Sequence, residues 1–482
     1  GLARSLEIRL TQFTLQFGEF LPMSKKRSTK QPTSPASPPI AKVSDPATRE
    51  GLSLEERSRL HQAFEPVPLD ASQGDLYVNL NSVRGQTDIV AKLFNRIQLN
   101  PKPKSWLVAG HKGCGKSTEL RRLSQQLELV NDARRYLTVI CTERDIDTVN
   151  VEFTEVMIVM LQRVATELRE RCGVRLDKNT FFREFFHRLQ QTLFATVQVD
   201  KLELTAGLAR ISASIKGSPK TRQDVREILS ADTATLQQEI NHLLRDATEK
   251  LRTKGYAGLV VIFDSLDRIV DREQAETLFV GRATEMTGFE CQMVFTMPIS
   301  LAYAETTNQL ANLYGSPPTI VPMTKLRGLP PDRQPSMEGI DLFRAMVDTR
   351  LKKAGVERDR VFASDEALVD LILATGGQPN ELMSFMQELI ETGAFPITQV
   401  AVTQLRISRS REYRWLSQED WQVLEIIKHQ GHYQPVDQTK VVLKRLLDGR
   451  AILHYLNARE WYDLNPIVQD IPMPSDTKGA PT

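Results

Sequence analysis

The sequence has little of what marks secreted or membrane proteins. Its 482 residues contain only four cysteines, and the spacing of Cys114, Cys141, Cys172 and Cys291 fits neither a disulfide framework nor a zinc site. No stretch approaches the roughly 18 consecutive apolar residues that a membrane-spanning helix needs, and the start of the chain lacks the compact apolar core of a secretory signal. We therefore expect a cytoplasmic protein with reduced thiols and no membrane partner.

An excess of one charge is also missing. Lysine and arginine number 62 and aspartate and glutamate 60, so the formal net charge is only +2. Such a balance neither indicates nor excludes nucleic acid as a partner. The composition is that of an ordinary soluble protein, and the length suffices for about three domains.

The two ends of the chain are predicted to lie outside the folded domains. Met23 is followed by Ser-Lys-Lys-Arg-Ser-Thr-Lys, which looks like a translation start, so residues 1–22 are interpreted as an upstream extension. Residues 24–48 are rich in Ser, Pro, Thr and Lys and too poor in large apolar residues to build a core. We expect residues 1–50 to be a disordered arm and residues 471–482 a disordered tail.

A complete phosphate-binding loop follows a short apolar run, in the order Gly-His-Lys-Gly-Cys-Gly-Lys-Ser. Its glycines let several backbone N–H groups point at one phosphate, and a helix opening at Lys116 adds the positive end of its dipole. Lys116 is expected to reach the β- and γ-phosphates of a nucleotide, and the Ser117 hydroxyl to hold Mg²⁺. The residues expected to bind the nucleotide are Gly110, His111, Lys112, Gly113, Cys114, Gly115, Lys116, Ser117 and Thr118.

Cys114 lies inside this loop, where an adduct on its thiol is expected to crowd the phosphates. We predict that alkylation of Cys114 blocks nucleotide binding and that ATP protects the thiol.

A second run of apolar residues, 258–263, ends in Asp264. It predicts a buried central strand that delivers one carboxylate beside the nucleotide, where Asp264 would act on Mg²⁺ through bound water. Asp267, three residues later, is expected to orient the attacking water, because hydrolysis depends mostly on positioning and charge stabilisation. Residues 136–143 predict a further parallel strand, with Glu143 at its end as an alternative water-positioning residue and Asp145 and Asp147 as helix caps.

Residues 150–255 are predicted to form a long helical insertion, because apolar residues recur there at helical spacing. Within it, residues 197–215 alternate apolar with polar and predict a β-hairpin. Lys216, Lys220, Arg222 and Arg226 follow the hairpin. They are interpreted as a solvated face, with contact to a partner or a nucleic-acid strand as the alternative.

Over about residues 76–468 these features resemble the AAA+/STAND-type P-loop ATPases, including Orc- and NACHT-like proteins. The phosphate loop and the Asp264 strand carry the resemblance, and an Arg84-Gly85 turn before an amphipathic helix resembles the element on the adenine side. The resemblance implies an α/β fold with a parallel sheet of the additional-strand class, and ATP with Mg²⁺ as cofactors. It also implies that Thr296, near the end of a strand over residues 291–297, senses the γ-phosphate, so the expected catalytic residues are Lys116, Asp264, Asp267 and Thr296.

The resemblance also implies two further domains. After an ATPase domain over residues 51–325, residues 326–405 are expected to be a helical lid and residues 406–470 a winged-helix-like domain. In the lid, Gly-Gly-Gln-Pro379-Asn380 matches a nucleotide-sensing element, but Asn380 replaces the arginine that is common there. Arg268, Arg272 and Arg282 are candidates for an arginine finger, and an ordinary surface role is the alternative for each.

The function implied is that of a slow ATPase that acts as a nucleotide-dependent switch on a protein partner or through self-association. The alternative is a DNA-associated ATPase that loads or remodels, using the winged helix and the basic residues Arg406, Arg409, Arg411 and Arg414. A nucleotide kinase is disfavoured because it needs a short acceptor-binding lid and fewer residues.

Overall fold

The computed structural model describes residues 51–472, apart from 86–87, 131–133, 150, 177–206, 210, 214–218, 231–232, 304, 435–438 and 457–458. The predicted arm over residues 1–50, nearly all of the predicted tail, and residues 197–206 of the predicted hairpin lie outside the described residues.

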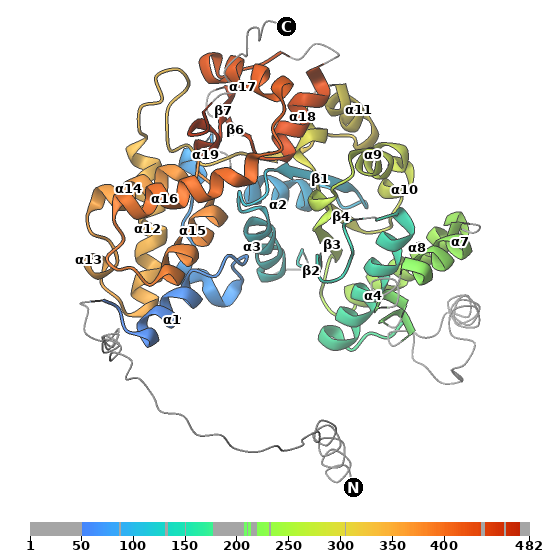
Figure 1. Cartoon of the computed structure of the whole chain (residues 1–482). Helices are drawn as coiled ribbons and strands as arrows, with labels where there is room; N and C mark the ends of the chain where they lie inside the picture. The colour runs from blue at the N-terminus through green and yellow to red at the C-terminus, as the bar shows by residue number, and fades with distance from the viewer. Residues whose placement is uncertain are drawn as a thin grey trace, which may run out of the picture. The chain divides into compact units, whose positions relative to one another are not determined.

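Five parallel strands form a central sheet: β1 (Ser105–Gly110), β2 (Tyr136–Thr142), β3 (Gly258–Asp264), β4 (Gln292–Met297) and β5 (Thr319–Val321). Their order across the sheet is β2-β3-β4-β1-β5 (Figure 1). β4 therefore lies between β1, which leads into the phosphate loop, and β3, which ends at Asp264. This intervening strand is what the term additional-strand class denotes, so that prediction is confirmed.

β5 is not among the strands that the sequence predicted. It has three residues, and prolines precede and follow it. A segment of this length shows no periodicity, and its pairing with Val108, Ala109 and Gly110 of β1 is what makes it a strand.

Both faces of the sheet are covered, as expected of parallel strands. Side chains alternate along β1, so Leu107 and Ala109 join one core and Trp106 and Val108 the other. The second core also contains apolar residues of α2 (Ile89–Leu99) and α3 (Lys116–Leu129). The first contains those of α4 (Phe153–Cys172) and α8 (Thr233–Arg252).

The insertion between β2 and β3 is helical where it is described, with α7 (Pro219–Ser230) between α4 and α8. The predicted hairpin is wrong in its described part, because residues 207–209 and 211–213 are helical. Leu208 and Ile211 are both fully buried, and their spacing of three puts them on one helical face. Burial of that face decided the local structure.

Shorter elements complete this half of the chain. They are α1 (Leu54–Ala63), 3₁₀ turns at Ala71–Leu76 and Asn81–Val83, α9 (Arg272–Glu276), a π-helical turn at Thr277–Gly281, α10 (Ala283–Thr287) and α11 (Glu305–Tyr314). Ser53 caps α1 in a reciprocal capping box with Glu56.

Five helices follow the sheet, where the sequence predicted a lid: α12 (Met337–Ala354), α13 (Arg358–Val361), α14 (Asp365–Ala374), α15 (Pro379–Thr392) and α16 (Gln399–Ser410). Pro379 occupies the first turn of α15, as predicted, where its missing N–H is not needed. α1 packs against α12 and α15. The N-terminal segment of the described chain is therefore part of this helical layer.

The C-terminal elements are α17 (Gln418–Gln430), α18 (Lys440–Asp448), β6 (Ile452–Leu456), β7 (Glu460–Leu464) and α19 (Pro466–Gln469). β6 and β7 form an antiparallel hairpin, so two helices and a hairpin follow one another in this part of the chain. Leu453, Tyr455 and Trp461 of this hairpin are buried in the core that also contains Trp106 of β1. The hairpin is thereby packed against the sheet. Among all the described helices, none is long and apolar enough to cross a membrane.

Candidate functional site

The phosphate loop connects β1 to α3, and α3 begins at Lys116. Gly113 and Gly115 have φ angles of +83° and +99°, a region that side chains with a Cβ rarely adopt. The backbone must turn sharply before the helix, which explains why glycine stands at these two positions of the loop. The loop therefore aims backbone N–H groups at the space in front of a helix N-terminus, which is an anion-binding arrangement.

The Lys116 ammonium lies under the loop and is 5% exposed. Its Nζ donates to the carbonyl oxygens of Gly110, at 2.7 Å, and His111, at 2.8 Å, and lies 2.9 Å from a carboxylate oxygen of Asp267. Burial opposes the charge of Lys116, but the charge and hydrogen bond of Asp267, together with the nearby Cys114 and Asp264, outweigh it and the pKa of Lys116 is raised. Lys116 is therefore a fixed cation at the base of the loop.

Ser117 and Asp264 meet although 147 residues separate them in the chain, and the Ser117 hydroxyl donates to Asp264 Oδ1 at 2.9 Å. Burial, together with the charge of Asp267, raises the pKa of Asp264 to about 7. A hydroxyl and a carboxylate oxygen at this distance are donors that Mg²⁺ prefers. Among the described residues no group of three or more His, Cys, Asp or Glu side chains could hold a metal. Mg²⁺ usually binds one or two protein oxygen ligands together with substrate phosphates and water, so the pair fits that ion.

Thr296 is fully buried on β4 and does not line the cavity that opens in front of the phosphate loop. Its hydroxyl donates to the carbonyl of Phe263 at 3.0 Å and accepts from the backbone N–H of Asp267 at 3.4 Å. These bonds hold the turn after β3 in which Asp267 lies.

Arg84, from the turn before α2, lies directly beneath the loop and is 2% exposed. Its guanidinium donates to the carbonyl of Cys114 and to the Thr324 hydroxyl, and it lies 3.8 Å from Glu119. The Arg84-Gly85 turn noted in the sequence therefore supports the phosphate loop through these contacts.

His111 connects the loop to the C-terminal hairpin. Its Nε2 accepts the backbone N–H of His454 on β6 at 3.0 Å. Complete burial, with the nearby charges of His454 and Lys116, lowers the pKa of His111 well below its ordinary value. The ring is therefore a neutral acceptor at neutral pH.

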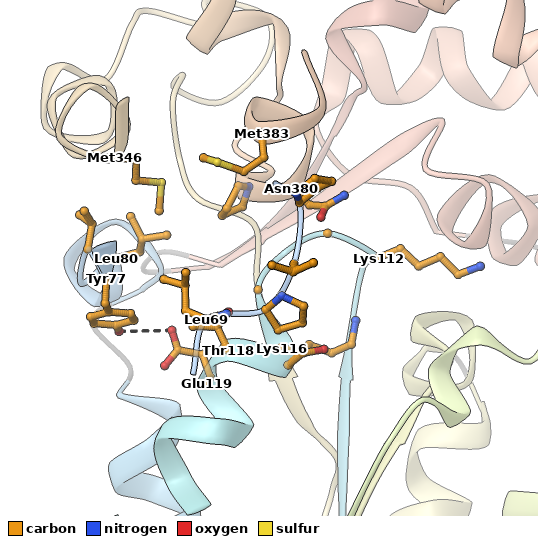
Figure 2. A pocket seen from close by; sticks show the side chains of 18 of the residues that line it. Leu69, Tyr77, Leu80, Lys112, Lys116, Thr118, Glu119, Met346, Asn380 and Met383 are labelled. Carbon is orange, nitrogen blue, oxygen red and sulfur yellow. Dashed lines mark hydrogen bonds between the residues drawn. The ribbon is translucent and has the colours of Figure 1, made fainter. Parts of the chain in front are cut away.

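A cavity of about 360 Å³ opens in front of the loop. Figure 2 shows Tyr77, Leu80 and Met346 at one end and Lys112 at the other, with Asn380 and Met383 between them. The volume is that of a small-molecule site. Its charged lining consists of six cations and two carboxylates, which suits a polyanion: Arg84, Lys112, Lys116, Arg268, Arg350 and Arg450, with Glu119 and Asp267.

The apolar end of the cavity is built by residues 66–80, which the sequence did not assign to the site. Thr118, the last residue of the predicted loop, anchors this segment because its hydroxyl accepts the N–H of Leu69 at 3.2 Å. Tyr77 donates to Glu119 of α3 at 3.3 Å (Figure 2). No local signal could have identified the segment, since its role depends on packing against α3.

The later helices and the C-terminal part of the chain also contribute three polar or charged residues to the cavity lining, beside Met346, Pro379 and Met383: Asn380, Arg350 and Arg450. The N–H of Asn380 donates to the carbonyl of Gly113 at 3.2 Å, so α15 contacts the loop directly. Arg350 on α12 is 6% exposed, and its Nε has no hydrogen-bond partner within the described part of the chain. Sequence reasoning named Asn380 and missed both arginines.

The other candidates for charged roles lie in ion pairs. Arg268, which lines the cavity, pairs with Glu143, while Arg272 pairs with Glu276 and Arg282 with Glu285. Glu143 thus lies beside the site. Asp145 and Asp147 are not helix caps, because the N-cap of α4 is Glu152. Their side chains bind Thr142 and Arg222 instead.

The predicted solvated basic face after the hairpin is wrong for two residues. Arg222 and Arg226 are each 9% exposed and pair with acidic residues that flank or begin α4. Lys216 lies outside the described residues. Near the C-terminus, Arg406 pairs with Asp470, and Arg409 with Glu388 and Glu412.

The four cysteines are buried free thiols. The Cys114 side chain belongs to the core below the loop and does not line the cavity. An adduct there cannot crowd the phosphates directly, so the reason given for the alkylation prediction is wrong.

The comparisons agree with this geometry in one region. Residues 87–289 match the model of the KAP family P-loop domain. No curated protein sequence matches this chain. The similar solved structures include a Walker-type ATPase of Pyrococcus abyssi, with 13% identity, a TM-score of 0.39, and coverage of 84% of this chain and 98% of that one.

Another is the Drosophila ORC bound to DNA, with 11% identity, a TM-score of 0.35, and coverage of 94% of this chain and 97% of that one. Both TM-scores are too low to support a conclusion. The family match includes the phosphate loop, Asp264 and Asp267, and ends before β4. With the parallel sheet, it establishes that this chain contains a P-loop NTPase domain.

Proposed function

We propose that the chain binds ATP with Mg²⁺, hydrolyses it slowly, and acts as a nucleotide-dependent switch on a protein partner. The observation that carries the proposal is the hydrogen bond between Ser117 and Asp264, beside the ion pair of Lys116 and Asp267. It supports a role for Ser117 and Asp264 in binding a metal ion, next to the buried cation Lys116, and both Ser117 and Lys116 line the cavity.

Each of these residues has a part in the proposed reaction. Ser117 and Asp264 would hold Mg²⁺, which when bound neutralises phosphate charge. Lys116 would turn from Asp267 toward the β- and γ-phosphates, because a polyphosphate carries more negative charge than one carboxylate. Asp267 would then be free to orient water, in the position that Thr296 fixes.

The switch follows from what surrounds the cavity. Residues 66–80, the helices α12 and α15, and Arg450 of the C-terminal part line the same space as the phosphate loop. A nucleotide would contact all of them at once, and loss of its terminal phosphate would weaken some contacts and not others. Such differential binding is what shifts a protein between two arrangements.

The ATPase part is tested with Lys116→Ala, and Lys352→Ala on the exposed face of α12 is the matched control. Binding of a fluorescent ATP analogue and release of phosphate are measured for both. We expect Lys116→Ala to lose binding by about 100-fold or more, since a buried ammonium at the phosphates disappears. Normal binding by this variant would overturn the proposal.

The switch part is tested by limited proteolysis and small-angle scattering with ADP and with a non-hydrolysable ATP analogue. Different cleavage patterns or dimensions in the two states are expected. Identical results, in protein shown to bind both nucleotides, would leave an ATPase without a switch.

A protein partner, or a second copy of the chain, is favoured over DNA because four arginines considered for DNA contact are paired within the chain. Phosphate release with and without double-stranded DNA separates the two. Strong stimulation, with binding that weakens steeply as salt rises, would support the DNA-associated alternative.

A further inference from the structure

Arg450 is held in the cavity by the backbone around it. It follows α18 with a φ angle of +58°, a conformation that a residue with a side chain rarely adopts. Its carbonyl accepts hydrogen bonds from Asn465 Nδ2, at 3.1 Å, and from the Tyr413 hydroxyl, at 3.4 Å. Strained backbone that the surroundings hold in place is concentrated at functional sites.

Arg450 lines the cavity together with Lys112, Lys116 and Arg268. Its charge also lowers the pKa of Lys112 and of His111, which both belong to the loop, after the larger effect of burial. The guanidinium is therefore within electrostatic range of the phosphate-binding residues.

Arg450 already has an anionic partner in Glu381 of α15. That carboxylate is 14% exposed and belongs to the residue after Asn380, whose N–H contacts Gly113 of the loop. Glu381 and a bound phosphate would thus compete for one guanidinium. A guanidinium can bind a phosphate with two parallel hydrogen bonds, and the greater charge of the phosphate favours it.

We propose that Arg450 contacts the terminal phosphate of the bound nucleotide, and that Glu381 competes with that phosphate for it. This rests on the proposed function, because it presupposes nucleoside triphosphate binding. It makes the C-terminal part of the chain a sensor of the γ-phosphate: with a triphosphate Arg450 turns to the phosphate, and with a diphosphate it stays on Glu381 and α15.

The test compares affinities for ADP and for a non-hydrolysable ATP analogue by calorimetry in four variants. Arg450→Gln should weaken the ATP analogue about tenfold or more while changing ADP less than threefold, because a charge-assisted bond to the γ-phosphate is lost. Arg450→Lys should keep part of the preference. Glu381→Gln should have the opposite effect. It should raise the affinity for the ATP analogue relative to that for ADP, because the neutral amide competes less well than the Glu381 carboxylate for Arg450.

Arg406→Gln is the matched control, because Arg406 is also in an ion pair but lies outside the cavity. It should change neither affinity. Equal weakening of both nucleotides by Arg450→Gln and Arg450→Lys, or weakening of the ATP analogue by Glu381→Gln, would overturn the proposal for Arg450. Wild-type protein that binds neither nucleotide would overturn the proposed function as well, so the two failures are distinguishable.

Discussion

The Nε2 atom of His111 lies 3.0 Å from the backbone nitrogen of His454, whose N–H it accepts. The first residue belongs to the phosphate loop and the second to β6, 343 positions later. The carbonyl of His454 accepts in turn from the N–H of Met323, beyond β5. A movement of the loop therefore cannot leave the C-terminal hairpin unaffected, and this contact gives the proposed switch a physical path.

This hydrogen bond also predicts a pH dependence of stability. The pKa of His111 is well below 6.5 in the folded protein, because burial disfavours the charged ring. Unfolding therefore takes up a proton below about pH 6.5, and the stability that neutral His111 contributes is present above that pH and lost as the pH falls. Relative to His111→Gln, which keeps an acceptor, the wild-type protein should lose up to about 1.4 kcal/mol for each pH unit below pH 6.5.

Urea unfolding at a series of pH values measures this difference. His429→Gln is the control, because His429 is exposed and pairs only with Glu425 of its own helix in the described structure. Its curve should follow that of the wild-type protein. Parallel curves for wild type and His111→Gln would show that His111 is not buried in its neutral form.

Asp264→Asn should separate binding from hydrolysis. The amide can still accept from Ser117, but it is a poor ligand for Mg²⁺. We expect phosphate release to fall by about 100-fold or more, and nucleotide affinity in EDTA to stay within about threefold of wild type. Asp359→Asn, at an exposed position of α13, should change neither quantity. A variant that keeps its magnesium-dependent turnover would exclude Asp264 as the metal-binding carboxylate.

Gly377 connects the helices after the sheet to the segment that supports Arg84. Its φ angle is +82°, and a Cβ built there would lie 1.8 Å from the carbonyl oxygen of Thr324. Gly377→Ala should therefore lower the free energy of unfolding by about 3 kcal/mol or more. Gly173→Ala is a matched control, because Gly173 has a φ angle of +62° but no atom within 4 Å of the added Cβ.

Only the backbone strain remains in that control, which should cost about 1 kcal/mol. Chemical denaturation of both variants measures the comparison. Equal losses at the two positions would mean that α15 can move away from Thr324 without cost.

The thiols give a test of how tightly the loop is closed. All four cysteines are buried, and burial raises the pKa of Cys141 well above its ordinary value and that of Cys291 in the same direction. Reaction with N-ethylmaleimide should be about 100-fold slower in native protein than in urea, because thiolates are both scarce and covered. Nucleotide should slow modification of Cys114 further by holding the loop closed. Rapid labelling of Cys114 in native protein, followed by mass spectrometry of its peptide, would contradict the packing described.

Much of the fold could be predicted because its signals are local. The run before Gly110 has four consecutive apolar residues and the run before Asp264 has five, which is enough to identify buried strands. Pro379 and the glycines before it mark a helix boundary. Where the local signal was short or ambiguous, prediction failed. β5 is three residues long, and the alternation in residues 207–213 was overridden by burial of one helical face.

The candidate site divides in the same way. The sequence alone determined that a phosphate loop with Lys116 and Ser117 is present, because the backbone turn of such a loop requires glycines at fixed positions among consecutive residues. It also predicted Asp264 and Asp267, because apolar strands that end in acids are local features. Only the tertiary structure brings Ser117 to Asp264 and Lys116 to Asp267, each at 2.9 Å. It also places Arg84 against the loop and brings Arg350 and Arg450 to the cavity. Except for those of Arg84 with Cys114 and Glu119, these contacts join residues more than a hundred positions apart. No short-range pattern specifies which of many arginines packing will bring to one cavity.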